Sequence, residues 1–163
     1  EASVPLVRNS EMNLFYGTLY DGRINLGLMG TPYDAYLASD FEDIKDKYKA
    51  FIILTPKMTD KLKKIAEENE NCLVITYKNH KITTDELRDF CRSKGVHIYS
   101  EKDAVIYANA SYFFLHTASH GKAEMKLPVG MSLRQIHGDR IDIENDILPR
   151  HTGYLFEIEH LDR

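Results

Sequence analysis

The chain has 163 residues, a length that fits one domain, or one domain with a small appendage. Its composition, 43% hydrophobic and 28% charged, is typical of a globular protein, and the formal net charge is −4. Lysine and arginine residues are scattered rather than gathered in a basic stripe, which argues against nucleic-acid binding. No apolar run approaches about 18 residues, so the sequence predicts no membrane span.

The first part of the chain is predicted to contain one helix and two strands. Apolar residues recur in patches at helical spacing over residues 10–29, and Gly30 is placed to end this helix. Residues 33–38 are expected to form a short strand. Residues 48–54 form a mainly apolar run closed by a Thr-Pro pair, which is the pattern of a strand buried on both faces.

Helices and strands continue to alternate in the next segment. Residues 59–68 carry apolar side chains on one side of a predicted helix, and residues 72–77 are predicted to form a buried strand. The sequence Thr-Thr-Asp-Glu at 83–86 matches a capping box, and the helix behind it is expected to end at Gly95. Residues 96–99 are expected to form a further strand.

This alternation predicts that residues 1–100 form an α/β domain, with a parallel sheet and helices packed on its faces. After residue 100 the pattern changes to short strands without helix-length segments between them. These strands are expected at residues 104–108, 111–118, 123–128 and 153–159. Residues 101–163 are therefore predicted to form a small antiparallel, sandwich-like subdomain.

Polar residues at the predicted strand ends are the candidate ligand-binding residues. Asp40, Thr55, Asn79 and His80 each come just after a predicted strand of the first domain. In an open parallel sheet, ligands bind in a crevice at the carboxyl ends of the strands. The competing and simpler interpretation is that these residues cap loops and turns.

The sequence offers no recognisable nucleophile or cofactor site. Cys72 begins a strand and Cys91 lies on the apolar side of a helix, so both are expected to be free structural thiols. The loop after residue 38 is dense with carboxylates and would repel a phosphate, which argues against a flavin or nucleotide. No cysteine and histidine set has the spacing of a zinc site. We therefore expect no catalytic residue, no cofactor and no metal in this chain.

Two further motifs are interpreted as structural. His116 lies within the strand-like sequence Phe-Phe-Leu-His-Thr-Ala, where a histidine is more often packed and hydrogen-bonded than catalytic. The sequence Asn-Ala-Ser at 109–111 matches a glycosylation acceptor, but it is short and is placed at a turn between strands. Neither motif is given a functional role.

The order of segments over residues 26–68 resembles the flavodoxin-like domain that follows the catalytic barrel in several glycoside hydrolases. The most similar pattern is that of the trimerisation domain of family 42 β-galactosidases, a fold similar to class I glutamine amidotransferases. The resemblance implies a flavodoxin-like parallel sheet with helices on both faces. The residues that match it are Gly30, Pro32, Tyr33, Asp34, Asp40, Tyr48, Lys49 and Tyr77.

Residues 87–128 also resemble the C-terminal part of such enzymes, and the sequence at 152–156 resembles their closing strand with one residue more. One departure is the short connection at 78–83, where the relatives have a longer glycine-containing loop. In the relatives the paired catalytic glutamates lie in the barrel, which a chain of this length cannot contain.

The resemblance therefore implies a non-catalytic accessory domain of a larger carbohydrate-active enzyme. A bacterial, cytoplasmic protein is favoured, but the sequence does not determine the compartment. The first residue is not methionine, which also predicts a piece of a longer protein. Its expected partners are the catalytic barrel of the same polypeptide and further copies of itself. Tyr16 and Tyr20, one helical turn apart, are the candidate assembly residues.

Two alternatives remain open at this point. One is a stand-alone enzyme similar to the amidotransferases, with a relocated nucleophile and His80 in its site. The other is a carbohydrate-binding module in the second half of the chain. Because sugar platforms expose flat aromatic rings, Tyr99, Tyr107 and Tyr112 are its candidate residues, although packing in the core explains them more simply.

Overall fold

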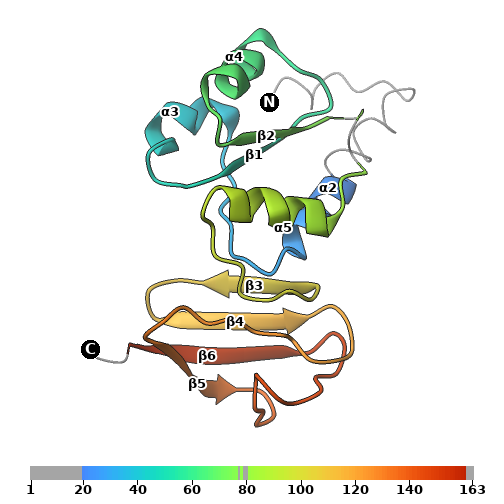
Figure 1. Cartoon of the computed structure of the whole chain (residues 1–163), viewed down its shortest axis with the longest axis vertical. Helices are drawn as coiled ribbons and strands as arrows, with labels where there is room; N and C mark the ends of the chain where they lie inside the picture. Colours follow the sequence, from blue (N-terminus) through green and yellow to red (C-terminus); the bar gives the residue numbers. More distant parts are fainter. Residues whose placement is uncertain (1–19, 77, 79–80, 161–163) are drawn as a thin grey trace. The chain divides into compact units, whose positions relative to one another are not determined.

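The computed structural model describes residues 20–76, 78 and 81–160 (Figure 1). The chain divides into two compact units. The first unit comprises the described residues up to Leu26 together with those between Asp34 and Val96. The second unit comprises Gly27–Tyr33 and the described residues from His97 onward.

The first unit combines short helices with a small parallel sheet (Figure 1). Strand β1 pairs with β2 in register, from Phe51 opposite Cys72 to Leu54 opposite Ile75. Helix α4 connects the two strands, as a parallel crossover requires. The elements are α2 (Asp21–Gly27), η3 (Ala38–Asp40), α3 (Phe41–Ile44), β1 (Phe51–Leu54), α4 (Asp60–Glu68), β2 (Cys72–Ile75) and α5 (Thr84–Ser93).

Both long helices of this unit begin at capping threonines. The Thr59 side chain accepts a hydrogen bond from the backbone N–H of Leu62 at the start of α4. At the start of α5, Thr83 and Glu86 form the predicted capping box, in which each side chain binds the other residue's backbone N–H. Helix α5 ends at Ser93 with Lys94 as its C-cap, and Gly95 follows with a φ of 73°, in the left-handed region. The predicted capping box is therefore confirmed.

The predicted parallel sheet is larger than the observed one. Residues 33–38 and 96–99 are not strands, so the sheet has two strands within the described part of the first unit. The side chains of Tyr33, Tyr36 and Leu37 are exposed, so this segment lacks the buried face that a strand would need. The mixed α/β class is confirmed, whereas a flavodoxin-like sheet is not evident in the described residues.

Residues 96–99 do not form a strand because their polar groups pair elsewhere in the second unit. The Thr31 hydroxyl donates to the His97 carbonyl at 2.8 Å, and the Tyr99 N–H donates to the Gly30 carbonyl at 2.8 Å. Gly30 does not end helix α2, which stops at Gly27. Its φ of 73° instead serves a close approach, because a Cβ there would lie 2.1 Å from the Ser100 carbonyl oxygen.

The second unit is built on a four-stranded antiparallel sheet in its described residues (Figure 1). The strand order is β3-β4-β6-β5. The strands are β3 (Ala104–Ala108), β4 (Tyr112–Thr117), β5 (Met131–His137) and β6 (Gly153–His160). The strands predicted at 104–108, 111–118 and 153–159 are thus confirmed with small shifts of their ends. The strand predicted at 123–128 is wrong, because only Met125 forms an isolated bridge.

The core of the second unit lies on one face of this sheet. Cross-strand pairing places Ile106 beside Leu115 and Phe113 beside Phe156, all at most 2% exposed. Loop residues, including Ala123 and Leu148, cover this face. The described residues therefore place loops where the predicted sandwich would have a second sheet. The opposite face of the sheet carries the alternate residues of each strand.

Candidate functional site

Asp40 and Thr55, two of the residues predicted at strand ends, have local structural roles, and only Thr55 follows a strand. The Asp40 carboxylate accepts hydrogen bonds from the Leu37 N–H at 3.3 Å and the Ser39 hydroxyl at 2.9 Å. It lies at the junction of η3 and α3, where a carboxylate suits a helix start. Thr55 is 5% exposed, and its hydroxyl donates to the Lys57 carbonyl at 2.7 Å. None of these bonds joins the two residues to each other.

Asn79 and His80, the other two residues of the predicted crevice, lie outside the described residues. The proposed common crevice at the strand ends therefore remains a prediction. The two residues that can be described match the simpler interpretation, in which they shape loops and turns.

A chain of hydrogen bonds between aromatic and acidic side chains joins the segment at 34–36 to Tyr48, just before β1. The Tyr48 hydroxyl donates to the Asp34 carboxylate at 2.6 Å, and 2.6 Å also separates the Tyr48 and Tyr36 hydroxyl oxygens. Because Tyr48 has one proton and gives it to Asp34, Tyr36 must donate to Tyr48. The hydrogen bond donated to the Asp34 carboxylate raises the pKa of the Tyr48 phenol well above its ordinary value.

Aromatic rings support this hydrogen-bonded chain from one side. The Tyr48 ring lies 6.2 Å from Phe51 of β1, and Phe51 lies 5.1 Å from Phe41 of α3 (centre to centre), both in edge-to-face orientations. Sequence reasoning placed Asp34 and Tyr48 in two predicted strands, at residues 33–38 and 48–54. It missed their pairing because they belong to separate segments of the chain.

A small pocket with charged walls lies between α3 and α4. Its volume is about 230 Å³, and Phe41 and Ile65 supply its apolar part. Glu42, Lys61, Lys64 and Glu68 contribute side chains of both charges. Such a mixed lining does not select one ligand charge.

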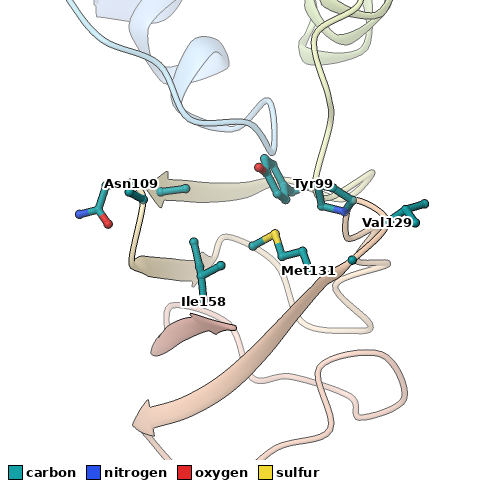
Figure 2. Close-up of a pocket in the computed structure, with 9 residues that line it drawn as sticks. Tyr99, Asn109, Val129, Met131 and Ile158 are labelled. Atoms are coloured by element: carbon teal, nitrogen blue, oxygen red, sulfur yellow. The ribbon is translucent and has the colours of Figure 1, made fainter. Parts of the chain in front are cut away.

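The larger pocket, of about 320 Å³, lies at one end of the sheet of the second unit (Figure 2). Figure 2 shows Tyr99, Met131 and Ile158 around a common space. The Asn109 side-chain oxygen accepts hydrogen bonds from the Ser111 and Tyr112 N–H groups, both at 2.8 Å, so its work is to hold the β3–β4 turn. The lining is mainly apolar and open to solvent on the side of Val129, which is 90% exposed.

The three tyrosines proposed for sugar binding divide into two groups. Tyr99 is half-buried and packs against Phe113 at 5.2 Å and His97 at 4.6 Å between ring centres. Burial raises the pKa of its phenol. Tyr107 and Tyr112 are instead 60% and 47% exposed, on the face of the sheet opposite the core. Only these two are available to a ligand on that face.

Neither cysteine has a lowered thiol pKa in the described part of the chain. Cys72 and Cys91 are both free. Burial raises the pKa of each thiol, which lowers the fraction that is present as the reactive thiolate. No group of three or more metal-ligating side chains occurs among the described residues. No helix in this part of the chain has the length and apolar character to cross a membrane.

Comparison of the chain with protein-family models, with curated proteins and with solved structures gave no match.

Proposed function

We propose that this chain is a non-catalytic accessory and assembly domain of a larger carbohydrate-active enzyme, similar to a β-galactosidase. In this proposal the first unit belongs to a flavodoxin-like fold and packs on the catalytic barrel and on further copies of itself. The βαβ unit made by β1, α4 and β2 is the building block of such a fold, and this supports the proposal. The segment resemblance at residues 26–68 and 87–128 supplies the enzyme class.

The observation that carries the assembly role is the outward face of helix α2. Gly22 and Leu26 are buried, and a Cβ on Gly22 would lie 2.9 Å from the Leu54 side chain, so this face packs inside the first unit. Tyr20 and Ile24 are 62% and 47% exposed. Tyr20 directly precedes α2 and Ile24 lies within it, so both are exposed at the start of the helix. A helix that carries apolar groups on both sides is suited to packing between two partners.

Assembly can be tested by sedimentation of this chain and of its full-length parent protein over a range of concentrations. We expect concentration-dependent self-association that a Tyr20→Ser, Ile24→Ser double variant abolishes. Tyr107→Ser is the matched control, because Tyr107 is equally exposed, at 60%, but belongs to the second unit. Monomeric behaviour of both the chain and the parent would contradict the assembly role.

The exposure of Tyr107 and Tyr112 favours a second candidate function, carbohydrate binding by the second unit. Tyr107 pairs across the strands with Phe114, with 6.3 Å between ring centres, and Tyr112 lies opposite Glu157. The face thus offers aromatic rings beside a hydrogen-bonding carboxylate. Retention of the chain on polysaccharide affinity gels, lost in a Tyr107→Ser, Tyr112→Ser variant, would support this function. Passage of the unaltered chain without retardation would contradict it.

A further inference from the structure

The outer face of the second unit's sheet carries a pair of histidines. His116 lies on β4, and His151 belongs to the loop that leads into β6. Their imidazole rings are 6.1 Å apart between centres, and the ring planes are inclined by 27°. His116 is half-buried and His151 is exposed, so solvent reaches the pair.

Buried hydrogen bonds hold the His151 loop against β4. Thr117, which follows His116 and is 4% exposed, donates its hydroxyl proton to the Pro149 carbonyl at 2.6 Å. The same oxygen accepts from the Thr152 N–H at 3.1 Å. The His151 N–H donates to the Thr117 carbonyl at 2.8 Å. His151 therefore has its backbone fixed on both sides by one buried residue of β4.

The backbone of His151 is also in an unusual conformation. Its φ is 58°, in the left-handed region, which few non-glycine residues adopt and in which asparagine, aspartate and histidine are enriched. Gly153 lies directly opposite His116 on β6, and a Cβ there would lie 2.9 Å from the Phe114 ring, which fills this space. The hydrogen bonds to Thr117 hold His151 beside β4, where its ring lies 6.1 Å from that of His116.

The separation of the rings matches that of two imidazoles on one metal ion. A metal–nitrogen distance of about 2.0–2.1 Å puts each ring centre about 3.2 Å from the metal. Two imidazoles on one ion then have centres roughly 4.5 Å apart when adjacent and 6.4 Å apart when opposite. The observed 6.1 Å is within this range.

We propose that His116 and His151 form a two-histidine site for a first-row transition-metal ion. Imidazole nitrogens suit Zn²⁺, Cu²⁺ and Ni²⁺, whereas Mg²⁺ and Ca²⁺ require oxygen ligands. Cu²⁺ binds such a site most tightly among these ions and accepts a planar arrangement in which water completes the coordination. The site does not depend on the carbohydrate-related function proposed above.

The test is a titration of the full chain with CuCl₂ in a buffer that keeps imidazoles neutral. Calorimetry measures the affinity, and electron paramagnetic resonance identifies the ligand atoms. We expect one tight Cu²⁺ ion per chain with nitrogen couplings from two imidazoles. His116→Gln and His151→Asn should each weaken this binding by about 10-fold or more. Asparagine is chosen at 151 because it tolerates positive φ. The double variant should bind Cu²⁺ with about the same affinity as the weaker of the two single variants, because the loss of either histidine removes the two-histidine site.

His120→Asn is the matched control, since His120 is another exposed histidine of the second unit. It should leave the tight binding unchanged. Circular dichroism of each variant separates loss of the site from loss of the fold. The proposal is overturned if a folded His116→Gln or His151→Asn variant keeps the affinity of the unaltered chain, or if His120→Asn lowers the affinity equally. MgCl₂ should produce no comparable binding.

Discussion

The two units bury apolar strands to different extents. In the first unit all four residues of β1 are apolar, yet each is only half-buried, and β2 has one buried residue, Ile75. In the second unit β4 alternates between buried and more exposed positions, and its buried residues Phe113 and Leu115 are 0% exposed. An apolar run thus indicates a strand, but the strands and loops that pack around that strand determine how far its side chains are buried.

The largest expected difference in stability between the two units comes from removing one aromatic ring from each sheet. Phe113→Ala removes a fully buried ring packed against Tyr99 and Phe156, and it should destabilise the second unit by about 3–5 kcal/mol. Phe51→Ala removes a half-buried ring of β1 and should cost clearly less. Urea denaturation followed by amide NMR signals of each unit measures both effects. Equal losses of stability in the two variants would contradict the conclusion that Phe113 is packed more tightly than Phe51.

The next effect concerns two glycines with the same φ of 73° but different surroundings. Gly95→Ala meets no atom within 4 Å and should cost only the strain of a left-handed residue, about 1–2 kcal/mol. Gly30→Ala meets in addition the Ser100 carbonyl at 2.1 Å, so it should destabilise the protein clearly more. Chemical denaturation of the two variants gives the difference, and equal costs would argue against the close approach at Gly30.

A smaller effect is expected at the capping box of α5. Thr83→Ala removes the side-chain acceptor for the Glu86 N–H and should cost about 1 kcal/mol. The backbone N–H of Thr83 lowers the pKa of the Glu86 carboxyl. The stabilisation is therefore present above the ordinary pKa of glutamate and is lost as the pH falls through the lowered folded-state value. Denaturation at a series of acidic pH values should show this loss in the unaltered chain and not in Glu86→Gln.

The smallest effect should appear in the titration of Tyr48. Its pKa is raised in the folded state, so the contribution to stability is present below the ordinary tyrosine pKa and is lost as the pH rises toward the folded value. Spectrophotometric titration should include a phenol that ionises at a pH well above the ordinary tyrosine value. In Asp34→Asn this phenol should ionise at lower pH, because the main hydrogen bond to a carboxylate is gone. An unchanged titration would show that the bond does not persist in solution.

Local features of the fold were predictable from the sequence. The capping box at Thr83 and Glu86 and the left-handed Gly95 just after α5 depend on residues within a few positions of each other. Strand β5 was missed because its pattern, with Arg134 and Gln135 at the centre of Met131–His137, lacks a continuous apolar alternation. It is stabilised as a strand by pairing with β6, where Arg134 bonds Glu157 and Glu159.

The candidate sites were less predictable than the fold. Asp40 and Thr55 were found by their position after predicted strands, and their described contacts are local. The Tyr36, Tyr48 and Asp34 chain depends on how an extended segment approaches the start of β1. No spacing rule predicts such contacts, because the intervening loops set them.

By itself, the sequence determined the mixed α/β class, the caps of the long helices and the strand character of most apolar runs. These depend on side-chain period and on hydrogen bonds between near neighbours, which a linear pattern contains. Tertiary structure alone decided that the parallel sheet has two strands among the described residues, that the antiparallel order is β3-β4-β6-β5, and that His116 meets His151. Each of these features depends on contacts between segments that are far apart in the sequence. Such contacts form only when the core packs and brings these segments together.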